Sequence, residues 1–469
     1  MIRTRFSPSP TGMIHLGNAR AALFSALFST KSNGAFLLRI EDTDAARSEQ
    51  KFSDQLQDDL HWLGIHWQEG PGVGGPHGPY FQSQRQEIYN RYYQKLEQEN
   101  LAYPCFCSDA QLAINRKLQL SKGKPPRYLG TCRRLTAEEV ANKVAQGEKP
   151  TLRFRVPENT KIEFTDLVKG LQHFNSDDIG DFIIRRADRS ASFLFCNAID
   201  DSLMEISHVI RGEDHLANTP RQLMILKSLA MNAPLYGHLS MITGDDGSPL
   251  SKRHGSFGLN DFRQQGFLNQ AILNYLARLS HAYDQQELLT FSQLAENFHF
   301  EKLSRAPARF DKNQLQHWQK EAVMKLDNAA VWQWLGADLQ ERVPVASRDL
   351  FAQVMRQNVL FPSDANKWAD VFFGESLPFS PEHLQVLQQA GHAFFVAAKK
   401  VSDQHGHDLK AILQDLKTTL NVSGKNLFMP VRIALTGEQH GPELPQIGNL
   451  LGAGKIQQRF LQAAELVKM

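Results

Sequence analysis

The segment FSPSPTGMIHLGNAR, residues 6–20, places two prolines, a glycine and a histidine ahead of an alanine-rich run. Prolines fix the backbone φ, so Pro10 and the proline two residues before it stiffen the path, while Gly12 permits a tight turn. A helix that begins near Gly17 presents free N–H groups and the positive end of its dipole, which together favour phosphate. His15 stands beside this helix start and can donate a hydrogen bond. The segment predicts a nucleotide-phosphate site, although an ordinary strand-to-helix turn with an incidental surface histidine also fits it.

A second segment, ITGDDGSPLSKRHGS at 242–256, carries two adjacent cations in a loop of small residues. Lys252 offers a mobile point charge and Arg253 a planar fork, and both suit a triphosphate whose negative charge grows on the departing pyrophosphate. Ser251 precedes them in the same loop. A short basic loop is often only a solvated surface feature, so this segment carries weight only together with the first.

Three of the four cysteines fall between positions 105 and 132. Cys105 and Cys107 are separated by one residue, and Cys132 follows further along the chain. So few cysteines in so long a chain do not make a disulfide framework, and the cluster therefore indicates metal or thiol chemistry. Reduced cysteines that pack as small hydrophobic residues are the alternative. We expect the fourth, Cys196, in a strand of the core.

The elements that position the first segment form a strand, a helix and a second strand. Alternation in residues 2–6 predicts a strand, residues 17–30 predict a helix with a buried face of Ala, Leu and Phe, and AFLLRI at 35–40 predicts an apolar strand. Such a unit implies a parallel sheet, which binds ligands at the carboxyl ends of its strands. The acidic run that begins with Glu41 follows the second strand and lies at such an end.

The pattern breaks between about 70 and 175 and then resumes. Further strands are predicted at 182–186, 193–200 and 207–212. A helix follows, with Thr219 as its N-cap and Pro220 at its first position. The middle block thus has the pattern of a domain inserted into a doubly wound sheet.

Beyond about residue 260 the sequence favours helices and carries few strand signals. Helical patterns cover residues 267–280, 381–400 and 407–420. This region shows no cluster of catalytic residue types, which favours a recognition or packing module.

Composition sets wider bounds on the protein. A chain of 469 residues is too long for one ordinary core and predicts three or more domains. Its 52 Lys and Arg residues nearly balance 50 Asp and Glu residues, so an RNA or DNA partner must be bound by local basic patches. No run approaches the roughly 18 apolar residues of a membrane span, and no signal-peptide core follows the first residues. We therefore expect a soluble, cytoplasmic protein with no membrane association.

Four motifs together resemble a known family. They occur in the order PSPTG followed by HLGN, RIEDTD at 39–44, VIRGEDH at 209–215 and PLSKRHG at 249–255. The set resembles the class I aminoacyl-tRNA synthetases and, within them, the glutamyl-tRNA synthetases, whose HIGH and KMSKS signatures are similar to the first and last motifs. The resemblance is firmest over residues 1–320. Its departures from the signature letters are Leu16, Asn18, Pro249 and Leu250.

The resemblance implies an α/β fold: a Rossmann-like doubly wound parallel sheet with an inserted acceptor-binding domain, followed by an all-α C-terminal region. The implied domains are two catalytic halves at 1–80 and 181–245, an inserted tRNA acceptor-binding domain at 81–180, a stem-contact domain with the SKR loop at 246–320, and a helical anticodon-binding region at 321–469.

The implied reaction activates glutamate with ATP and Mg²⁺ to glutamyl-adenylate and then transfers it to the 3′ end of tRNA. No protein nucleophile is required, so catalysis would rest on positioning and charge stabilisation. The catalytic residues that the resemblance implies are His15, Gly17, Ser251, Lys252 and Arg253. The implied ATP-binding residues are Pro10, Gly12, His15, Gly17 and Lys252.

Glutamate itself calls for an arginine fork at its side-chain carboxylate and for a carboxylate at its ammonium group. The resemblance maps glutamate binding onto Arg5, Ser9, Glu41, Phe193, Asn197 and Arg211. Arg5 and Arg211 are both candidates for the γ-carboxylate, and a solvated charge on an edge strand is the alternative for Arg5. Phe193 stands where many relatives have a tyrosine, so it contributes shape without a hydroxyl.

Some relatives hold zinc in the inserted domain with this cysteine spacing. A closed zinc site takes four ligands, so Cys105, Cys107 and Cys132 need a fourth. The resemblance offers Tyr128, because Arg134 occupies the position where other relatives place that ligand and cannot bind zinc.

Contacts with tRNA are implied at both ends of the chain. Basic residues that would face the acceptor end of tRNA are Lys117, Lys122, Lys124, Arg127, Arg133 and Arg134, although a solvated loop also fits them. The C-terminal helices favour tRNA charging over a shortened paralogue that lacks them. Charging of tRNA(Glu), of tRNA(Gln) or of both stays open, and a monomer is expected. An RNA-independent adenylating enzyme and a non-catalytic RNA-binding regulator are the alternatives from other classes.

Overall fold

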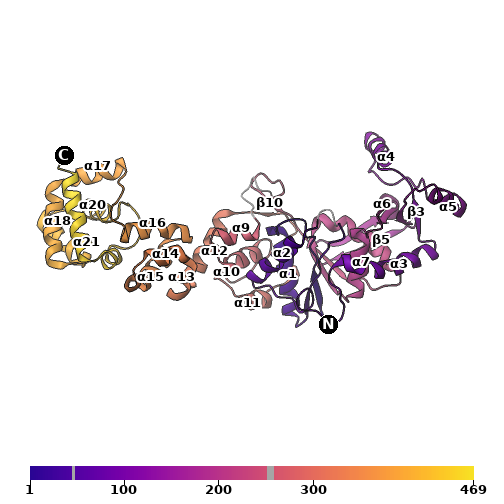
Figure 1. The fold of residues 1–469 in the computed structure, drawn as a ribbon, viewed down its shortest axis with the longest axis horizontal. Helices are drawn as coiled ribbons and strands as arrows, with labels where there is room; N and C mark the ends of the chain where they lie inside the picture. Colours follow the sequence, from indigo (N-terminus) through magenta and orange to yellow (C-terminus); the bar gives the residue numbers. More distant parts are fainter. Residues whose placement is uncertain (45–47, 251–257, 469) are drawn as a thin grey trace. The chain divides into compact units, whose positions relative to one another are not determined.

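The computed structural model describes the chain over residues 1–44, 48–250 and 258–468. The chain divides into two compact units, coloured along the sequence in Figure 1. The first unit joins Met1–Arg263 to Asn269–Gln314, and the second joins Gln264–Leu268 to Leu315–Met469. Among the described residues, no helix combines the length and the apolar composition that a membrane span requires.

A parallel sheet forms the centre of the first unit. Its strands in the described part of the chain are β1 Arg3–Phe6, β2 Ala35–Leu38, β8 His208–Gly212 and β9 Leu235–Leu239, in the spatial order β2-β1-β8-β9. α1, Leu16–Lys31, links β1 to β2 and packs against β1, β2 and β8. The predicted strand–helix–strand unit is therefore confirmed. Because every pair in this sheet is parallel, the carboxyl ends of these strands meet at one edge.

Burial explains why this unit is stable. All four residues of β2 are buried, as expected for a strand covered on both faces. Leu23, Phe24 and Leu27 of α1 are fully buried. The Thr4 hydroxyl on β1 donates a hydrogen bond of 2.8 Å to the Ser25 carbonyl on α1, which ties the strand to the helix.

Residues 193–200 form a helix, so the strand predicted there is wrong. α7 spans Phe193–Leu203. A short apolar run fits a buried strand or a buried helix, and periodicity alone does not separate the two. The polar residues of the segment carry the helical signal, because Asn197 and Asp201 lie four positions apart and both contact Arg39.

The strand predicted at 182–186 exists but lies outside the parallel sheet. It is β7, Phe182–Arg185, which pairs antiparallel with β4, Thr151–Phe154. β4 in turn pairs antiparallel with β3, Ala102–Cys105. β7 therefore closes a separate antiparallel sheet of the inserted region rather than resuming the parallel one.

Two local predictions around β8 also change. α8 spans Thr219–Ser228 with Pro220 near its start, but its N-cap is Asn218. The Thr219 hydroxyl is engaged with Arg211 instead of capping the helix. Cys196 is buried in the core as expected, although on α7 and not on a strand.

The inserted region also contains a hairpin that reaches the parallel sheet. β5, Lys161–Asp166, and β6, Gly170–Asn175, pair antiparallel. The Leu167 N–H at the hairpin turn donates a hydrogen bond of 2.8 Å to the Tyr236 carbonyl on β9. The helices of this region are α3 Gln86–Gln98, α4 Asp109–Ser121, α5 Ala137–Ala145 and α6 Ser176–Ile179.

Further α-helices and strands of the described chain lie between residues 50 and 309. They are α2 Gln50–Trp62, α9 Leu259–Gln264, α10 Asn269–Arg278, α11 Phe291–Glu296 and the parallel pair β10 Ile242–Thr243 and β11 Ala308–Arg309. The helix predicted within 267–280 is confirmed as α10.

The C-terminal region is helical, as predicted. Its helices are α12 Lys312–Lys325, α13 Asn328–Leu335, α14 Ala337–Arg342, α15 Arg348–Asn358, α16 Pro362–Phe373, α17 Pro381–Ala390, α18 His392–His405, α19 Leu409–Leu420, α20 Lys425–Thr436 and α21 Leu444–Leu466. The single helix predicted at 381–400 is two helices, because Gly391 adopts a φ of +83° between α17 and α18. One hydrophobic cluster, which includes Phe351, Phe395 and Phe460, fills the core of this unit.

Candidate active site

The N-terminus of α1 lies beyond the carboxyl end of β1. His15 is the N-cap residue, its side chain makes no capping hydrogen bond, and the first turn of α1 contains no acidic residue. The first N–H groups of a helix lack partners within the helix, so this end is available to an anion. His15 is exposed, but desolvation by the surrounding chain lowers the pKa of its imidazole, which leaves it neutral at neutral pH.

Gly12 and Gly17 are not required by the backbone or by packing. Neither has a positive φ, so the tight turn expected at Gly12 does not use the conformational freedom of glycine. A Cβ atom added at either position would meet no atom of the described residues within 4 Å. The absence of side chains at these two positions therefore leaves open space beside the start of α1.

The turn after β1 is tied to the acidic segment after β2. The Pro8 carbonyl accepts a hydrogen bond of 2.9 Å from the Glu41 N–H, and the Pro10 carbonyl accepts one of 3.2 Å from the Glu49 N–H. Pro10 is buried, whereas Ser9 between the two prolines is exposed. The rigid path predicted from the prolines thus brings the two segments together at one edge of the sheet.

The predicted catalytic residues Ser251, Lys252 and Arg253 lie outside the described residues. The residues on either side of that gap are described. Leu250 donates to the Ile242 carbonyl at 3.0 Å. Gly258 forms an antiparallel bridge with His15, and the Leu259 N–H donates to the Ile14 carbonyl at 3.0 Å. The chain therefore re-enters the described structure directly beside His15.

A buried charge network surrounds Asp201 on α7. Arg5 on β1 binds the Asp201 carboxylate through Nε and Nη2, at 3.1 and 3.2 Å. Arg39 binds the same carboxylate at 2.8 Å and also donates to the Asn197 side-chain carbonyl at 2.8 Å. Although burial alone raises it, the charges of Arg5 and Arg39 lower the pKa of the Asp201 carboxyl. Arg5 is thus a buried, paired cation and not a solvated charge on an edge strand.

Arg211 on β8 differs from Arg5 in its pairing. Its Nη2 donates to Thr219 Oγ1 at 2.8 Å and to Gln222 Oε1 at 2.9 Å, and its Nε donates to His238 Nε2 at 3.1 Å. Among the described residues its Nη1 is buried and has no hydrogen-bond partner. Burial lowers the pKa of the Arg211 guanidinium to about 10, so it still carries its charge at neutral pH. A buried cation with a free donor favours an anionic ligand.

Three more of the predicted glutamate residues, Glu41, Phe193 and Asn197, lie around this network. Glu41 is 6% exposed, and burial raises the pKa of its carboxyl while the Arg39 charge opposes that shift. The Phe193 ring stacks on the His215 ring, with centroids 5.1 Å apart. The Asn197 side-chain amide donates to the Phe193 carbonyl at 3.2 Å. The site thus combines a buried carboxylate, a buried cation and an aromatic surface.

Several residues of the site, among them Asp201, were given no role from the sequence. Arg39 stands in the quoted RIEDTD motif, yet its function as a second partner of Asp201 depends on α7, which was predicted as a strand. His238 and Asp166 lie in segments without a chemical motif. The helical spacing of Asn197 and Asp201 was the signal that could have identified them as partners of Arg39. The sequence holds no signal that pairs Asp166 with His238.

The cysteine cluster lies in the inserted region. The Sγ atoms of Cys105, Cys107 and Cys132 lie within 4.8 Å of one another, with 3.7 Å between those of Cys107 and Cys132. Tyr128 Oη is 3.4 Å from the Cys105 sulfur and 3.5 Å from the Cys107 sulfur. Tetrahedral Zn–S bonds of about 2.3 Å put two sulfurs about 3.8 Å apart, so these donors fit zinc.

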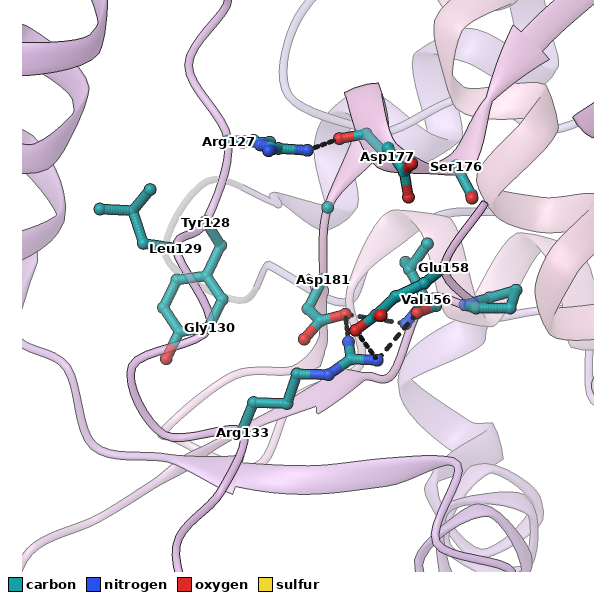
Figure 2. Close-up of a pocket in the computed structure, with 12 residues that line it drawn as sticks. Arg127, Tyr128, Leu129, Gly130, Arg133, Val156, Glu158, Ser176, Asp177 and Asp181 are labelled. Atoms are coloured by element: carbon teal, nitrogen blue, oxygen red, sulfur yellow. Dashed lines mark hydrogen bonds and ion pairs between the residues drawn. The ribbon is translucent and has the colours of Figure 1, made fainter. Parts of the chain in front are cut away.

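The basic surface of the inserted region is smaller than its sequence indicates. Figure 2 shows a pocket of about 190 Å³ in which Arg133 forms ion pairs with Asp181 and Glu158. Arg127 donates to the Asp177 carbonyl in the same view. The predicted basic residues that remain exposed are Lys117, Lys122, Lys124, Arg127 and Arg134.

Comparison with protein families matches nearly the whole chain. The model described as "tRNA synthetases class I (E and Q), catalytic domain" matches residues 1–317, and the model described as "Anticodon binding domain" matches residues 314–464.

Individual proteins match along their full length. The chain is 51% identical to glutamate–tRNA ligase 2 of Coxiella burnetii (strain RSA 331 / Henzerling II), with 99% of this chain and 100% of the relative covered. It is 50% identical to glutamate–tRNA ligase 2 of Nitrosococcus oceani, with 98% and 97% covered. The crystal structure of a glutamate tRNA ligase from Elizabethkingia meningosepticum in complex with its amino acid superposes with a TM-score of 0.89 at 27% identity, covering 99% of each chain.

Proposed function

The chain belongs to the class I tRNA synthetases for glutamate and glutamine, and we propose that it acts as a glutamate–tRNA ligase. The observation that carries this proposal is Arg211, a buried cation at the carboxyl edge of the parallel sheet whose Nη1 has no partner among the residues that the structure describes. The same edge holds the Glu41 carboxylate and the open N-terminus of α1. An anion, an ammonium group and a phosphate can therefore be bound side by side.

Of the two candidate arginines, Arg211 binds the γ-carboxylate of glutamate. The guanidinium of Arg5 already shares two hydrogen bonds with Asp201, whereas Nη1 of Arg211 donates to no described residue. Glu41 binds the α-ammonium group, with Ser9 and Asn197 beside it, because a buried carboxylate is stabilised by a cation. Phe193 contributes an apolar surface to the same pocket.

ATP binds with its phosphates at the N-terminus of α1, beside His15 and Gly17. Pro10 and Gly12 shape the turn that the nucleotide contacts, and Mg²⁺ accompanies the phosphates. Ser251, Lys252 and Arg253 act on the departing end of the triphosphate. Support for their role is the position of Gly258, the first described residue after them, which pairs with His15.

The chemistry consists of two displacements. An oxygen of the glutamate α-carboxylate forms a bond to the α-phosphorus of ATP, and the bond from that phosphorus to pyrophosphate breaks. The terminal ribose hydroxyl of tRNA then attacks the activated carbonyl carbon, loses its proton and releases AMP. The neutral His15 donates a hydrogen bond to the phosphates, and the protein supplies positions and charges but no nucleophile.

Two further parts of the proposal concern the rest of the chain. Zinc is held by Cys105, Cys107, Cys132 and Tyr128 and stabilises the inserted region. The exposed basic residues there contact the acceptor end of tRNA, and the C-terminal helices contact the anticodon. The five domain limits given under sequence analysis stay predictions. The enzyme acts as a cytoplasmic monomer and charges tRNA(Glu), with tRNA(Gln) as the alternative acceptor.

Glutamate-dependent exchange between ATP and pyrophosphate, measured with and without total tRNA, tests this proposal. We expect exchange that depends on tRNA, followed by charging of purified tRNA(Glu). Exchange with no RNA dependence supports an adenylating enzyme, and no exchange under either condition supports an RNA-binding regulator. Charging purified tRNA(Glu) and tRNA(Gln) side by side decides between the two acceptors.

A further inference from the structure

Asp166 and His238 form a buried carboxylate–imidazole pair that contacts Arg211. Asp166, at the end of β5, accepts hydrogen bonds from the backbone N–H groups of Val168 at 2.9 Å and Lys169 at 2.8 Å. Its other oxygen lies 2.5 Å from His238 Nδ1 on β9. Both side chains of the pair are fully buried. The pair therefore joins the inserted region to the parallel sheet.

The charge on Asp166 fixes which nitrogen of His238 carries the proton. Burial alone raises the pKa of the Asp166 carboxyl, but hydrogen bonds from His238 and from the backbone lower it overall, so the carboxylate is ionised. An ionised carboxylate can only accept hydrogen bonds, so His238 Nδ1 carries the proton and donates a hydrogen bond to Asp166. Burial lowers the pKa of the imidazole, which leaves Nε2 as an acceptor.

Nε2 of His238 faces Arg211. It accepts from Arg211 Nε at 3.1 Å, and the Thr219 hydroxyl that holds Nη2 also lies 3.1 Å from Nε2. The guanidinium is planar, so fixing Nε and Nη2 also fixes the direction of Nη1. Neutral His238 can accept this bond, whereas protonated His238 would repel the guanidinium.

We propose that Asp166 and His238 are positioning residues that aim the free Nη1 of Arg211 at the substrate carboxylate. This inference rests on the proposed function and adds to it a residue of the inserted region that acts on amino-acid recognition. The alternative is a purely structural tie, since the Leu167 N–H already bonds the Tyr236 carbonyl between the same two elements.

Three substitutions separate positioning from structure. His238→Ala removes the acceptor, and we expect the KM for glutamate to rise about tenfold, as for the loss of one hydrogen bond to a charged group. His238→Gln can place a side-chain carbonyl near the position of Nε2 and should restore most of that loss. Asp166→Asn keeps an acceptor for Nδ1 but removes the charge, so the increase should be smaller, about threefold.

Readouts other than activity alone identify the mechanism. The KM for ATP should change by less than about twofold, and the preference for glutamate over glutamine should fall, because a loosened Arg211 discriminates less between charged and neutral side chains. His281→Ala is the matched control, because His281 is another buried histidine whose Nε2 accepts a backbone N–H at 3.0 Å. We expect it to lower the melting temperature and to leave the KM for glutamate unchanged.

Several results would overturn the inference. Equal changes in the KM values for glutamate and ATP, an unchanged preference over glutamine, or no rescue by His238→Gln would leave only a structural tie. Arg211→Ala distinguishes this failure from failure of the proposed function. If Arg211→Ala loses glutamate charging while His238→Ala and Asp166→Asn charge normally, only the positioning inference is wrong. If Arg211→Ala itself charges normally, the assigned glutamate site is wrong as well.

Discussion

Each of the two units contains a deeply buried arginine that lacks a carboxylate partner among the described residues, and the two differ in how well they are satisfied. Arg459 on α21 donates to the carbonyls of Leu435 and Val371, which lie in the last turns of α20 and α16. Burial lowers the pKa of Arg459, as of Arg211, to about 10. Of the two, only Arg211 has a buried nitrogen, Nη1, that finds no hydrogen-bond partner in the described part of the chain.

This difference shows which feature of a buried cation indicates a binding site. Burial and a lowered pKa are common to both residues and therefore do not distinguish them. Arg459 satisfies carbonyls at helix ends, where a cation stabilises the fold. Arg211 carries an unsatisfied terminal donor, which natural proteins rarely leave without a ligand. Buried Nε atoms of Arg20, Arg39, Arg153 and Arg356 also lack a hydrogen-bond partner among the described residues, so the free donor indicates a binding site at Arg211 because it lies at the carboxyl edge of the parallel sheet. The comparison predicts that one arginine serves binding and the other serves stability.

The largest expected effect is that of Arg211→Ala on glutamate. We expect kcat/KM for glutamate to fall about a thousandfold, since removing one partner of a buried, hydrogen-bonded charge pair costs roughly 4 kcal/mol. The midpoint of chemical unfolding should change little, because the substitution also removes a buried charge. Steady-state charging and urea unfolding measure the two quantities. A lower free energy of unfolding with a normal kcat/KM for glutamate would show that Arg211, like Arg459, serves stability and not binding.

Arg459→Ala should give the reverse pattern. We expect the free energy of unfolding of the C-terminal unit to fall by about 2–4 kcal/mol, because two helix-end carbonyls lose their donor. The KM for glutamate at saturating tRNA should be unchanged. Arg459→Met, which keeps most of the apolar stem, separates the loss of packing from the loss of hydrogen bonds. A raised KM for glutamate with unchanged stability would contradict the structural role.

The cysteine cluster is a third kind of site, because we expect it to stabilise the inserted region only when zinc is bound. Cys132→Ser should reduce the metal content from about one zinc per chain to none and lower the melting temperature. Cys196→Ser is the matched control, because Cys196 is buried outside the cluster. Metal analysis of the purified protein measures the content. Wild-type protein without zinc after expression in zinc-supplemented medium would refute the zinc proposal.

Phe193→Tyr should give the smallest effect. The added hydroxyl can hydrogen-bond near the amino acid, so we expect the KM for glutamate to fall about threefold, within the range of one neutral hydrogen bond. Charging assays with varied glutamate measure it. A rise in KM would mean that the ring packed on His215 leaves no room for the hydroxyl.

The sequence predicted most of the architecture because its strongest signals are local. The strand before the first turn, α1 and β2 follow from alternation, from helical spacing and from an apolar run. The segment 193–200 was assigned to a strand because an apolar run is ambiguous without its polar residues. The break at Gly391 was missed because an isolated glycine inside a helical pattern does not always end the helix.

The candidate site was predicted less completely, because its chemistry depends on contacts between distant segments. Resemblance to the family indicated both Arg5 and Arg211, but only the structure shows that Asp201 already binds Arg5. Asp166 and His238 are 72 positions apart and belong to no recognisable motif, so a single sequence cannot predict that they pair. By its residue type Arg133 belongs to the predicted basic surface, but its ion pair with Asp181 neutralises it there.

A crystal structure with bound glutamate tests the central claim most directly. The account predicts that Nη1 of Arg211 donates to the γ-carboxylate at hydrogen-bond distance, about 2.7–3.2 Å, with His238 Nε2 still bonded to Arg211 Nε. A γ-carboxylate bound by Arg5 after its release from Asp201, with Nη1 of Arg211 left without a partner, would contradict it.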